Sequence, residues 1–223
     1  LQFFQFSERG RWLDALARDF HRIVAEAITA RARSSVALSG GSTPQPFYQR
    51  LNREPLPWSK IEWWLGDERW APPTDEASNE KMIRETLGRD QAEFAAHFHS
   101  WHLAKEPEEA AQAYEEGLRK QIGDPPVFDL ILLGLGQDGH TASLFPGTLA
   151  LKETVLYAMA NPVPQLKTTR LTFTFPVLNR ARQIWFLAQG MDKKIMVKKL
   201  IERSADIPAA QIQNPAQRLY WLH

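Results

Sequence analysis

Short, almost continuous apolar runs alternate along this chain with longer segments of helical periodicity. The clearest runs are SSVALS at 34–39, IEWWL at 61–65, FDLILL at 128–133 and IWFLA at 184–188. Strands that are apolar on both faces are typical of parallel sheets covered by helices on each side. The pattern therefore predicts an α/β fold with a parallel central sheet.

The segments around these runs carry apolar residues three and four positions apart, which is the spacing of amphipathic helices. Helices are expected over 7–33, 44–51, 78–87, 106–121 and 192–202. Further strands are expected at 98–103, 155–160, 171–175 and 219–222. Thr43 is the expected cap of the second helix, and Pro44 its first residue. Ligands of parallel sheets bind where loops leave the carboxyl ends of strands, so the loops after the four apolar runs are the candidate site.

Composition narrows the class of protein. Of 223 residues, 43% are hydrophobic and 24% charged, and a formal net charge of +1 offers no overall field for nucleic acid or an acidic membrane. The absence of cysteine excludes disulfides and thiolate chemistry, and no apolar run approaches the roughly 18 residues that span a bilayer. We expect a single domain over residues 1–223, in the cytoplasm, with a small-molecule ligand and neither nucleic acid nor membrane as partner. The oligomeric state is left open.

The loop after the first apolar run is rich in glycine and opens a helix. Its sequence is Ser39-Gly40-Gly41-Ser42-Thr43-Pro44. Glycine lets the backbone turn tightly and approach a ligand, and the free N–H groups of a following helix attract anions such as phosphate. No Gly-Lys-Ser/Thr follows, so this is not a nucleotide-binding P-loop. These residues fit a phosphate site and a plain strand-to-helix turn equally well.

Charged residues stand beside three other strands. Asp67 and Arg69 follow the second apolar run, where Asp67 can position a hydroxyl or a histidine and Arg69 can bind a phosphate or carboxylate with two N–H groups. Arg170 precedes an expected strand, and Lys193 opens an expected helix, where a cation is unfavourable unless an anion binds there. Taken alone, each group also fits a solvated turn.

The loop after the third apolar run, residues 134–146, contains G-x-G-x-x-G, which can indicate a dinucleotide site. Pro146 leaves no room for the helix that such a site requires, so we reject that interpretation. His140 is the side chain of this loop best suited to proton transfer near neutral pH, and Asp138 can fix its tautomer.

The sequence gives little support for a metal site or for a serine nucleophile. His97, His99 and His102 resemble a metal cluster, but on a strand only the first two share a face, so we expect no metal. No G-x-S-x-G occurs, so the nucleophile elbow of α/β-hydrolases is absent.

Taken together, the loops resemble the glucosamine-6-phosphate isomerase/6-phosphogluconolactonase family. The stretch QDGHTASLFP is the most specific match, and the resemblance covers about 36–200. The motifs occur in the family's order: SGGSTP at 39–44, GDERW at 66–70, LGLGQDGHTASLFPGT at 133–148, RLT at 170–172 and GMDKK at 190–194.

The resemblance implies a three-layer, Rossmann-like α/β domain that opens 6-phosphoglucono-δ-lactone with water, in the oxidative pentose phosphate pathway, without metal or organic cofactor. A base and a few oxyanion donors suffice for this reaction because a lactone carbonyl is already electrophilic. It implies these roles: His140 as general base; Gly40, Gly41, Ser42 and Thr43 as the substrate loop; Arg170 and Lys193 as phosphate ligands; Asp67 and Arg69 as further polar site residues.

Two rival functions are less well supported. The family's deaminases carry a glutamate five residues after the loop histidine, where this chain has Phe145, and this departure favours the lactonases. A sugar-phosphate sensor without catalysis would usually carry a DNA-binding segment, and no helix-turn-helix extension or basic domain is present.

Overall fold

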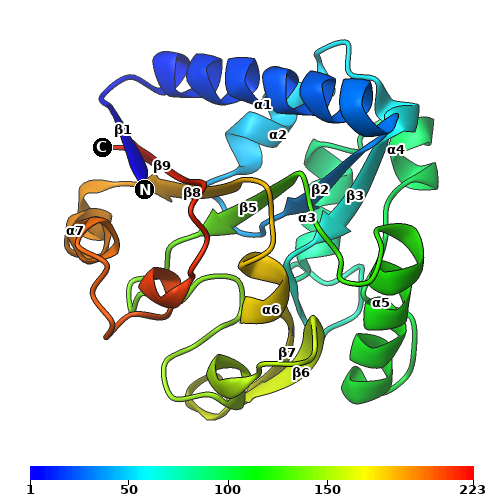
Figure 1. The fold of residues 1–223 in the computed structure, drawn as a ribbon, viewed down its shortest axis with the longest axis vertical. Coiled ribbons are helices and arrows are strands. Elements are labelled where there is room, and N and C mark those ends of the chain that lie inside the picture. Colours follow the sequence, from blue (N-terminus) through cyan, green and yellow to red (C-terminus); the bar gives the residue numbers. More distant parts are fainter.

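Six strands form one parallel sheet in the order β1-β9-β8-β5-β2-β3 (Figure 1). The computed structural model describes all residues, 1–223. The strands are Gln2–Phe6 (β1), Ser34–Leu38 (β2), Ile61–Leu65 (β3), Leu130–Gly134 (β5), Ile184–Gln189 (β8) and Gln217–Leu222 (β9). The four apolar runs therefore supply the four strands from β8 to β3, as predicted.

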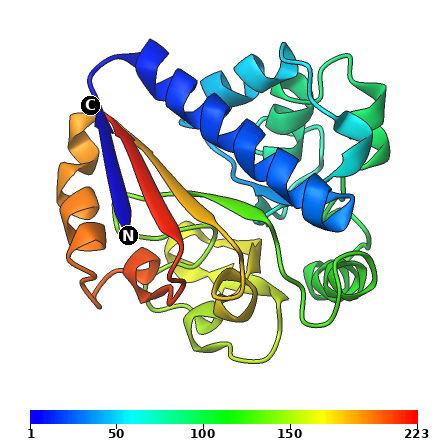
Figure 2. The same ribbon diagram turned by 45° about the horizontal axis from the view of Figure 1, so that its top comes forward.

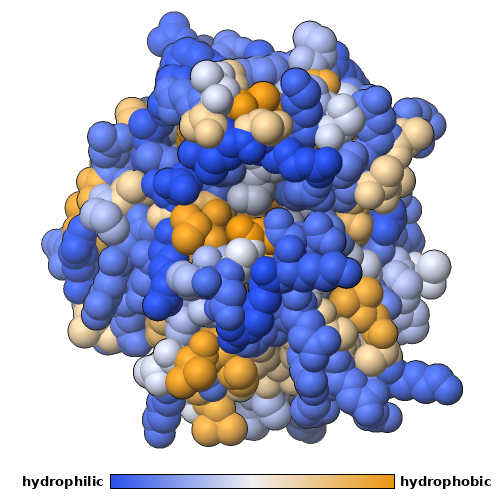
Figure 3. Space-filling model, turned by 45° about the vertical axis from the view of Figure 1, so that its right-hand side comes forward, coloured by the Kyte–Doolittle hydropathy of each residue, from blue (hydrophilic) through white to orange (hydrophobic).

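Helices cover both faces of this sheet, and Figure 2 shows α1 on one face and α7 on the other. The α-helices are Arg9–Arg31 (α1), Gln45–Asn52 (α2), Asn79–Thr86 (α3), Ala92–Ala96 (α4), Pro107–Gln121 (α5), Phe175–Leu178 (α6) and Lys194–Ile201 (α7). The predicted three-layer α/β architecture is confirmed. No helix is both long enough and apolar enough to cross a membrane. In the face drawn in Figure 3, the apolar side chains form separate small patches within a mostly hydrophilic surface.

A second, antiparallel sheet was not foreseen. It consists of Asp67–Arg69 (β4), Thr168–Phe173 (β7) and Ala158–Val163 (β6), in the order β4-β7-β6. We expected the first segment to be a loop, and the strands expected at 155–160 and 171–175 overlap β6 and β7 in part. The sheet starts at the carboxyl end of β3, where Gly66 N–H donates to Leu38 O (2.9 Å) and Gly66 O accepts from Phe173 N–H (2.8 Å). It therefore lies where ligands of the parallel sheet bind.

Two local expectations were wrong, and one strand was not anticipated. Residues 98–103 form no strand: Phe98 makes a single bridge to Trp63, and the chain then turns because the Trp101 indole is fully buried and donates to Leu65 O (3.1 Å). The first residues of the chain, which we did not assign, form edge strand β1. Thr43 does not cap α2, which begins at Gln45 without a side-chain cap.

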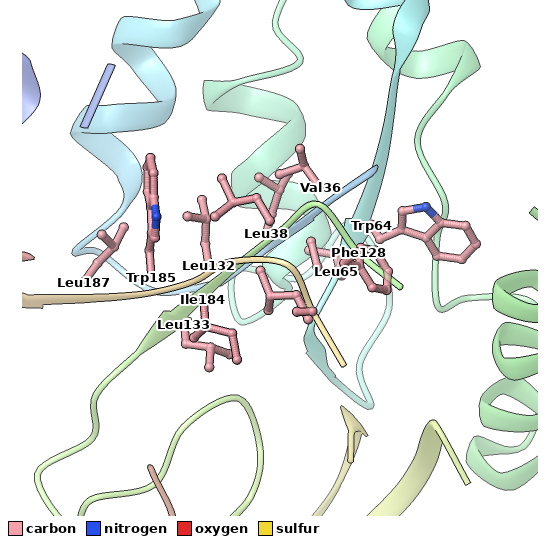
Figure 4. Close-up of a cluster of buried hydrophobic side chains, with 14 of the residues drawn as sticks. Val36, Leu38, Trp64, Leu65, Phe128, Leu132, Leu133, Ile184, Trp185 and Leu187 are labelled. Atoms are coloured by element: carbon pink, nitrogen blue, oxygen red, sulfur yellow. The ribbon is translucent and has the colours of Figure 1, made fainter. Parts of the chain in front are cut away.

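The core is one cluster of 57 buried residues that extends through both sheets. Figure 4 shows Trp185 and Leu187 of β8 on the side of the parallel sheet that faces α2, and Leu133 of β5 on the other side. Two adjacent tryptophans show the same alternation. Trp63 stacks on Phe20 of α1 (6.1 Å between ring centroids), whereas Trp64 meets Tyr114 of α5 edge-on (5.2 Å). Neighbouring residues of a strand thus join opposite helical layers.

Helix α3, which borders the candidate site, has a side-chain cap. Ser78 Oγ accepts from Lys81 N–H (3.2 Å) and donates to Glu68 Oε2 (3.0 Å). Ser78→Ala should therefore lower the free energy of unfolding by about 1–2 kcal/mol, the usual cost of a lost cap. Urea denaturation measures this. Ser7→Ala is a control, because Ser7 lies before α1, which has no side-chain cap; a loss of equal size there would contradict the assignment.

Candidate active site

Four loops meet at the carboxyl ends of β8, β5, β2 and β3, which are neighbours in the sheet. Chain order changes direction between β2 and β5, and such a switch point is where open α/β sheets bind ligands. A cavity of about 230 Å³ lies there. Among its lining residues are Gly40, Gly41, Ser42, Thr43, Asp67, Arg69, Asn79, Gly136, His140 and Lys193.

Two predicted residues lie beside this cavity and do not line it. Asp138 and Arg170 line an adjoining cavity of about 510 Å³. The two cavities share Asp67, Arg69 and His140 in their walls. The structure therefore places every predicted site residue around two adjoining cavities, with Lys193 lining one and Arg170 the other.

The glycine loop is shaped by close packing. A Cβ on Gly40 would lie 1.8 Å from Oδ1 of Asn79, and Gly41 has φ of +88°, so both positions require glycine. The backbone of Ser39 is held by α2, because Tyr48 Oη donates to the Ser39 carbonyl oxygen (2.9 Å) and accepts from the Ser39 N–H (3.0 Å). Since α2 has no side-chain cap, the free N–H groups of its first turn are available to an anion, except at Pro46, which has none.

Strand β4 presents alternate side chains to the site. Asp67 is buried, and its Oδ2 accepts a hydrogen bond from Ser143 Oγ (2.7 Å). Asn79 Nδ2 donates to the carbonyl oxygen of Asp67 (2.9 Å), which joins β4 to the start of α3 and to the wall against Gly40. This network fixes the Asp67 carboxylate at the floor of both cavities.

Glu68 points the other way and is fully buried. Burial raises the pKa of Glu68, although the hydrogen bonds that it accepts from backbone N–H groups act to lower it. Its donors are the backbone N–H groups of Arg69, Asn79 and Glu80, each at 2.7 Å, and Ser78 Oγ. Glu68 therefore ties β4 to α3 and does not face the ligand.

Arg69 and Arg170 face each other across the β4–β7 pair. Burial, and then the charge of Arg69, lowers the pKa of Arg170. The buried Nε of Arg170 has no hydrogen-bond partner, and neither guanidinium forms an ion pair with a carboxylate. Arg69 donates to the carbonyl oxygen of Ala77. The charges of Asp67 and Glu68 offset the lowering of the Arg170 pKa only in part, so two neighbouring guanidinium groups that form no ion pair attract an anion.

The loop after β8 supplies a third cation. Lys193 ends the 3₁₀ turn Met191–Lys193 directly before α7, is half-buried and lines the glycine-loop cavity. Lys194 is exposed and lines neither cavity. The structure therefore places Lys193, and not the neighbouring Lys194, at the cavity.

His140 is held by Asp138 in the loop after β5. Its Nδ1 lies 2.5 Å from Asp138 Oδ1, which also accepts the His140 backbone N–H (3.0 Å). Burial acts to raise the pKa of Asp138, but the His140 N–H and the imidazole charge together lower it below its ordinary value. An Nδ1–H bond to a carboxylate leaves Nε2 with its lone pair free, and Nε2 has no protein partner. This arrangement suits a general base.

Our sequence reasoning missed three contributors: Asn79, Ser143 and Glu68. Glu68 and Ser143 lie inside motifs that support the family resemblance, and Asn79 lies outside them. Nothing in the spacing of these residues shows that Asn79 contacts Gly40 or that Ser143 contacts Asp67. The histidines considered for a metal lie elsewhere: His97 and His99 contact Glu62 (3.2 and 2.9 Å), and His102 stacks beside Trp70. No group of three or more potential ligands is arranged to hold a metal ion.

Comparison with known proteins agrees with this geometry. The sequence profile of glucosamine-6-phosphate isomerases/6-phosphogluconolactonases matches residues 7–221. A 6-phosphogluconolactonase of Synechocystis sp. is 43% identical over 211 residues, which cover 89% of this chain and 85% of the relative. One from Rhizobium meliloti is 36% identical over 219 residues, which cover 93% of each.

Solved structures agree as well. A 6-phosphogluconolactonase from Shewanella baltica superposes with a TM-score of 0.88 at 27% identity, covering 100% of this chain and 97% of the other. That from Trypanosoma brucei gives 0.83 at 27% identity, covering 99% and 95%. These matches extend over all four loops of the site and confirm the resemblance read from their motifs. The chain belongs to the glucosamine-6-phosphate isomerase/6-phosphogluconolactonase family.

Proposed function

We propose that this protein hydrolyses 6-phosphoglucono-δ-lactone to 6-phosphogluconate, a step of the oxidative pentose phosphate pathway. Its curated relatives named 6-phosphogluconolactonase are 43% and 36% identical over most of the chain. The observation that carries the proposal is His140, held by Asp138, on the wall of a cavity that the glycine loop and a lysine also line. A base and an anion site in one hollow are what a phosphorylated lactone requires.

The first chemical step is attack by water on the lactone carbonyl. His140 Nε2 takes a proton from water while the oxygen forms a bond to C1, and Asp138 stabilises the imidazolium through Nδ1–H. The carbonyl oxygen becomes an oxyanion. Backbone N–H groups of the glycine loop and the Arg69 guanidinium are the available donors to it.

Collapse of the tetrahedral intermediate completes the reaction. The bond between C1 and the ring oxygen breaks, and the imidazolium returns its proton to that oxygen, so His140 ends neutral. The products are a carboxylic acid, which releases its proton to solvent and becomes a carboxylate, and a hydroxyl on the same open chain. No covalent enzyme intermediate forms, and Asp67, fixed by Ser143, is placed to accept hydrogen bonds from sugar hydroxyls.

The phosphate binds away from the reacting carbon. Lys193 and Arg170 are the cations that we assign to it, together with the N–H groups that precede α2. Binding energy from this remote group holds C1 against His140 and converts a slow encounter into an oriented reaction. The two cations line adjoining cavities that share Asp67, Arg69 and His140, so the bound substrate would occupy both.

The direct test is hydrolysis of freshly prepared 6-phosphoglucono-δ-lactone, with the spontaneous rate subtracted because the lactone opens in water unaided. We expect a rate well above background and proportional to enzyme concentration. A folded protein that gives no acceleration would overturn the proposal. Cytoplasmic location and the absence of nucleic-acid partners stay predictions from the sequence.

A further inference from the structure

Phe145 lies directly against the imidazole of His140. The two ring centroids are 4.2 Å apart and the planes are inclined by 29°, which is a stacked arrangement. Phe145 is buried, with 7% of its surface exposed. Its carbonyl oxygen accepts from Thr148 Oγ1 (2.8 Å) and Thr148 N–H (3.2 Å), so the backbone beneath the ring is anchored. The chemistry described above does not use this contact.

Two other neighbours confine the same imidazole. Asp138 holds Nδ1, and Gly136 lies so close that a Cβ there would be 2.1 Å from Nδ1. Gly136 N–H also donates to the carbonyl oxygen of His140 (2.8 Å), which closes the loop on itself. The ring is thus confined at its Nδ1 edge by Gly136 and Asp138 and covered by Phe145, while Nε2 has no protein partner.

We propose that Phe145 is a positioning residue for His140: its ring fixes the plane of the imidazole and stabilises the imidazolium that forms when Nε2 takes a proton. The proposal rests on the proposed function, because it assigns His140 the role of base. The face of an aromatic ring attracts a cation, and a stacked ring restricts rotation about the Cβ–Cγ bond. Both effects act on the reacting state more than on the bound substrate.

The test compares two changes at one position. Phe145→Leu keeps an apolar side chain but removes the ring, whereas Phe145→Tyr keeps the ring. We expect Phe145→Leu to lower kcat by about 2- to 30-fold, the range of a cation–π contact, with KM changed much less. Phe145→Tyr should retain most of kcat. If Phe145→Leu does not fold, Phe145→Met tests the same contact, because a flexible side chain fills irregular gaps.

A spectroscopic readout keeps the test independent of turnover. The Cε1 proton of His140, assigned by its loss in His140→Gln, should shift in the NMR spectrum of Phe145→Leu as the ring current disappears. Its titration midpoint should fall with the loss of imidazolium stabilisation, and the acid limb of the kcat profile should move to lower pH. The charged groups that share the cavities with His140, all unchanged in these variants, are Asp138, Asp67, Arg69, Arg170 and Lys193.

The outcomes separate this inference from the proposed function. A wild type without lactonase activity would remove the proposed function, while the NMR titration would still report on the ring contact. An active wild type, with a folded Phe145→Leu that keeps kcat, the acid limb and the His140 titration, would overturn the inference alone. Equal losses in Phe145→Leu and Phe145→Tyr would also overturn it, because the effect would then not follow the aromatic face.

Discussion

Replacement of His140 by alanine should lower kcat for lactone hydrolysis by about 10²- to 10⁴-fold, the usual contribution of a general base. The reason is geometric, since Nε2 of His140 is the nitrogen left free by Asp138 in the cavity wall. Binding of 6-phosphogluconate should change little, because the cations assigned to its phosphate are untouched. Steady-state rates with the spontaneous reaction subtracted, together with a binding titration, measure both quantities.

Asp138→Asn supplies the companion measurement. The pKa of Asp138 is lowered, so its carboxylate is ionised at every pH above the ordinary carboxyl pKa. The negative charge disappears only when the pH falls through the lowered pKa. Its support of His140 is therefore present throughout the neutral range, and removing the charge should lower kcat and move the acid limb of the profile to lower pH. For the first variant, full activity in His140→Ala would contradict the role of His140 as general base but not the lactonase activity itself. Asp67 would then be the next base to test.

The sequence predicted the parallel sheet well because a strand that is buried on both faces needs an almost continuous run of apolar residues, which is visible in the sequence. Ile61–Leu65 coincides with β3, and Ile184–Gln189 extends the predicted strand by one residue. The antiparallel sheet leaves no such trace. Its strand β7 begins with half-buried Thr168, Thr169 and Arg170, which form no apolar run. Its pairing with β4 is decided by contacts between segments that lie far apart in the chain.

In the candidate site, too, local features could be read from the sequence and tertiary contacts could not. Residues whose chemistry is local could be proposed from the sequence, and they line the two cavities: glycines before a helix, a histidine with an aspartate two positions earlier, charges at a strand end. Residues that act through tertiary contact were not, because nothing in the spacing of Asn79 places it against Gly40, or Ser143 against Asp67. Phe145 was noted only as a departure from the deaminases, and its stacking on His140 became visible only in three dimensions.

Lys193→Met and Arg170→Met should each lower kcat/KM for the phosphorylated lactone by about 10- to 150-fold, the value of one hydrogen bond to a charged group. Lys193 lines the glycine-loop cavity and Arg170 the adjoining one, where its Nε lacks a partner. A loss at both positions that is confined to the phosphorylated lactone would show that the phosphate is bound across the two cavities. Lys194→Met is the matched control, because Lys194 is exposed and lines neither cavity.

Glucono-δ-lactone without the phosphate distinguishes binding of that group from other roles of the two cations. The unphosphorylated lactone cannot gain from a phosphate ligand, so wild type, Lys193→Met and Arg170→Met should open it at similar, low kcat/KM. The loss in the variants should appear only with the phosphorylated substrate, because remote binding energy is then what accelerates the reaction at C1. Equal losses with both lactones would contradict phosphate binding at that residue and assign its charge to the oxyanion or to the fold. The same loss in Lys194→Met as in Lys193→Met would show that the positive charge of this helix start, and not one side chain in the cavity, attracts the substrate.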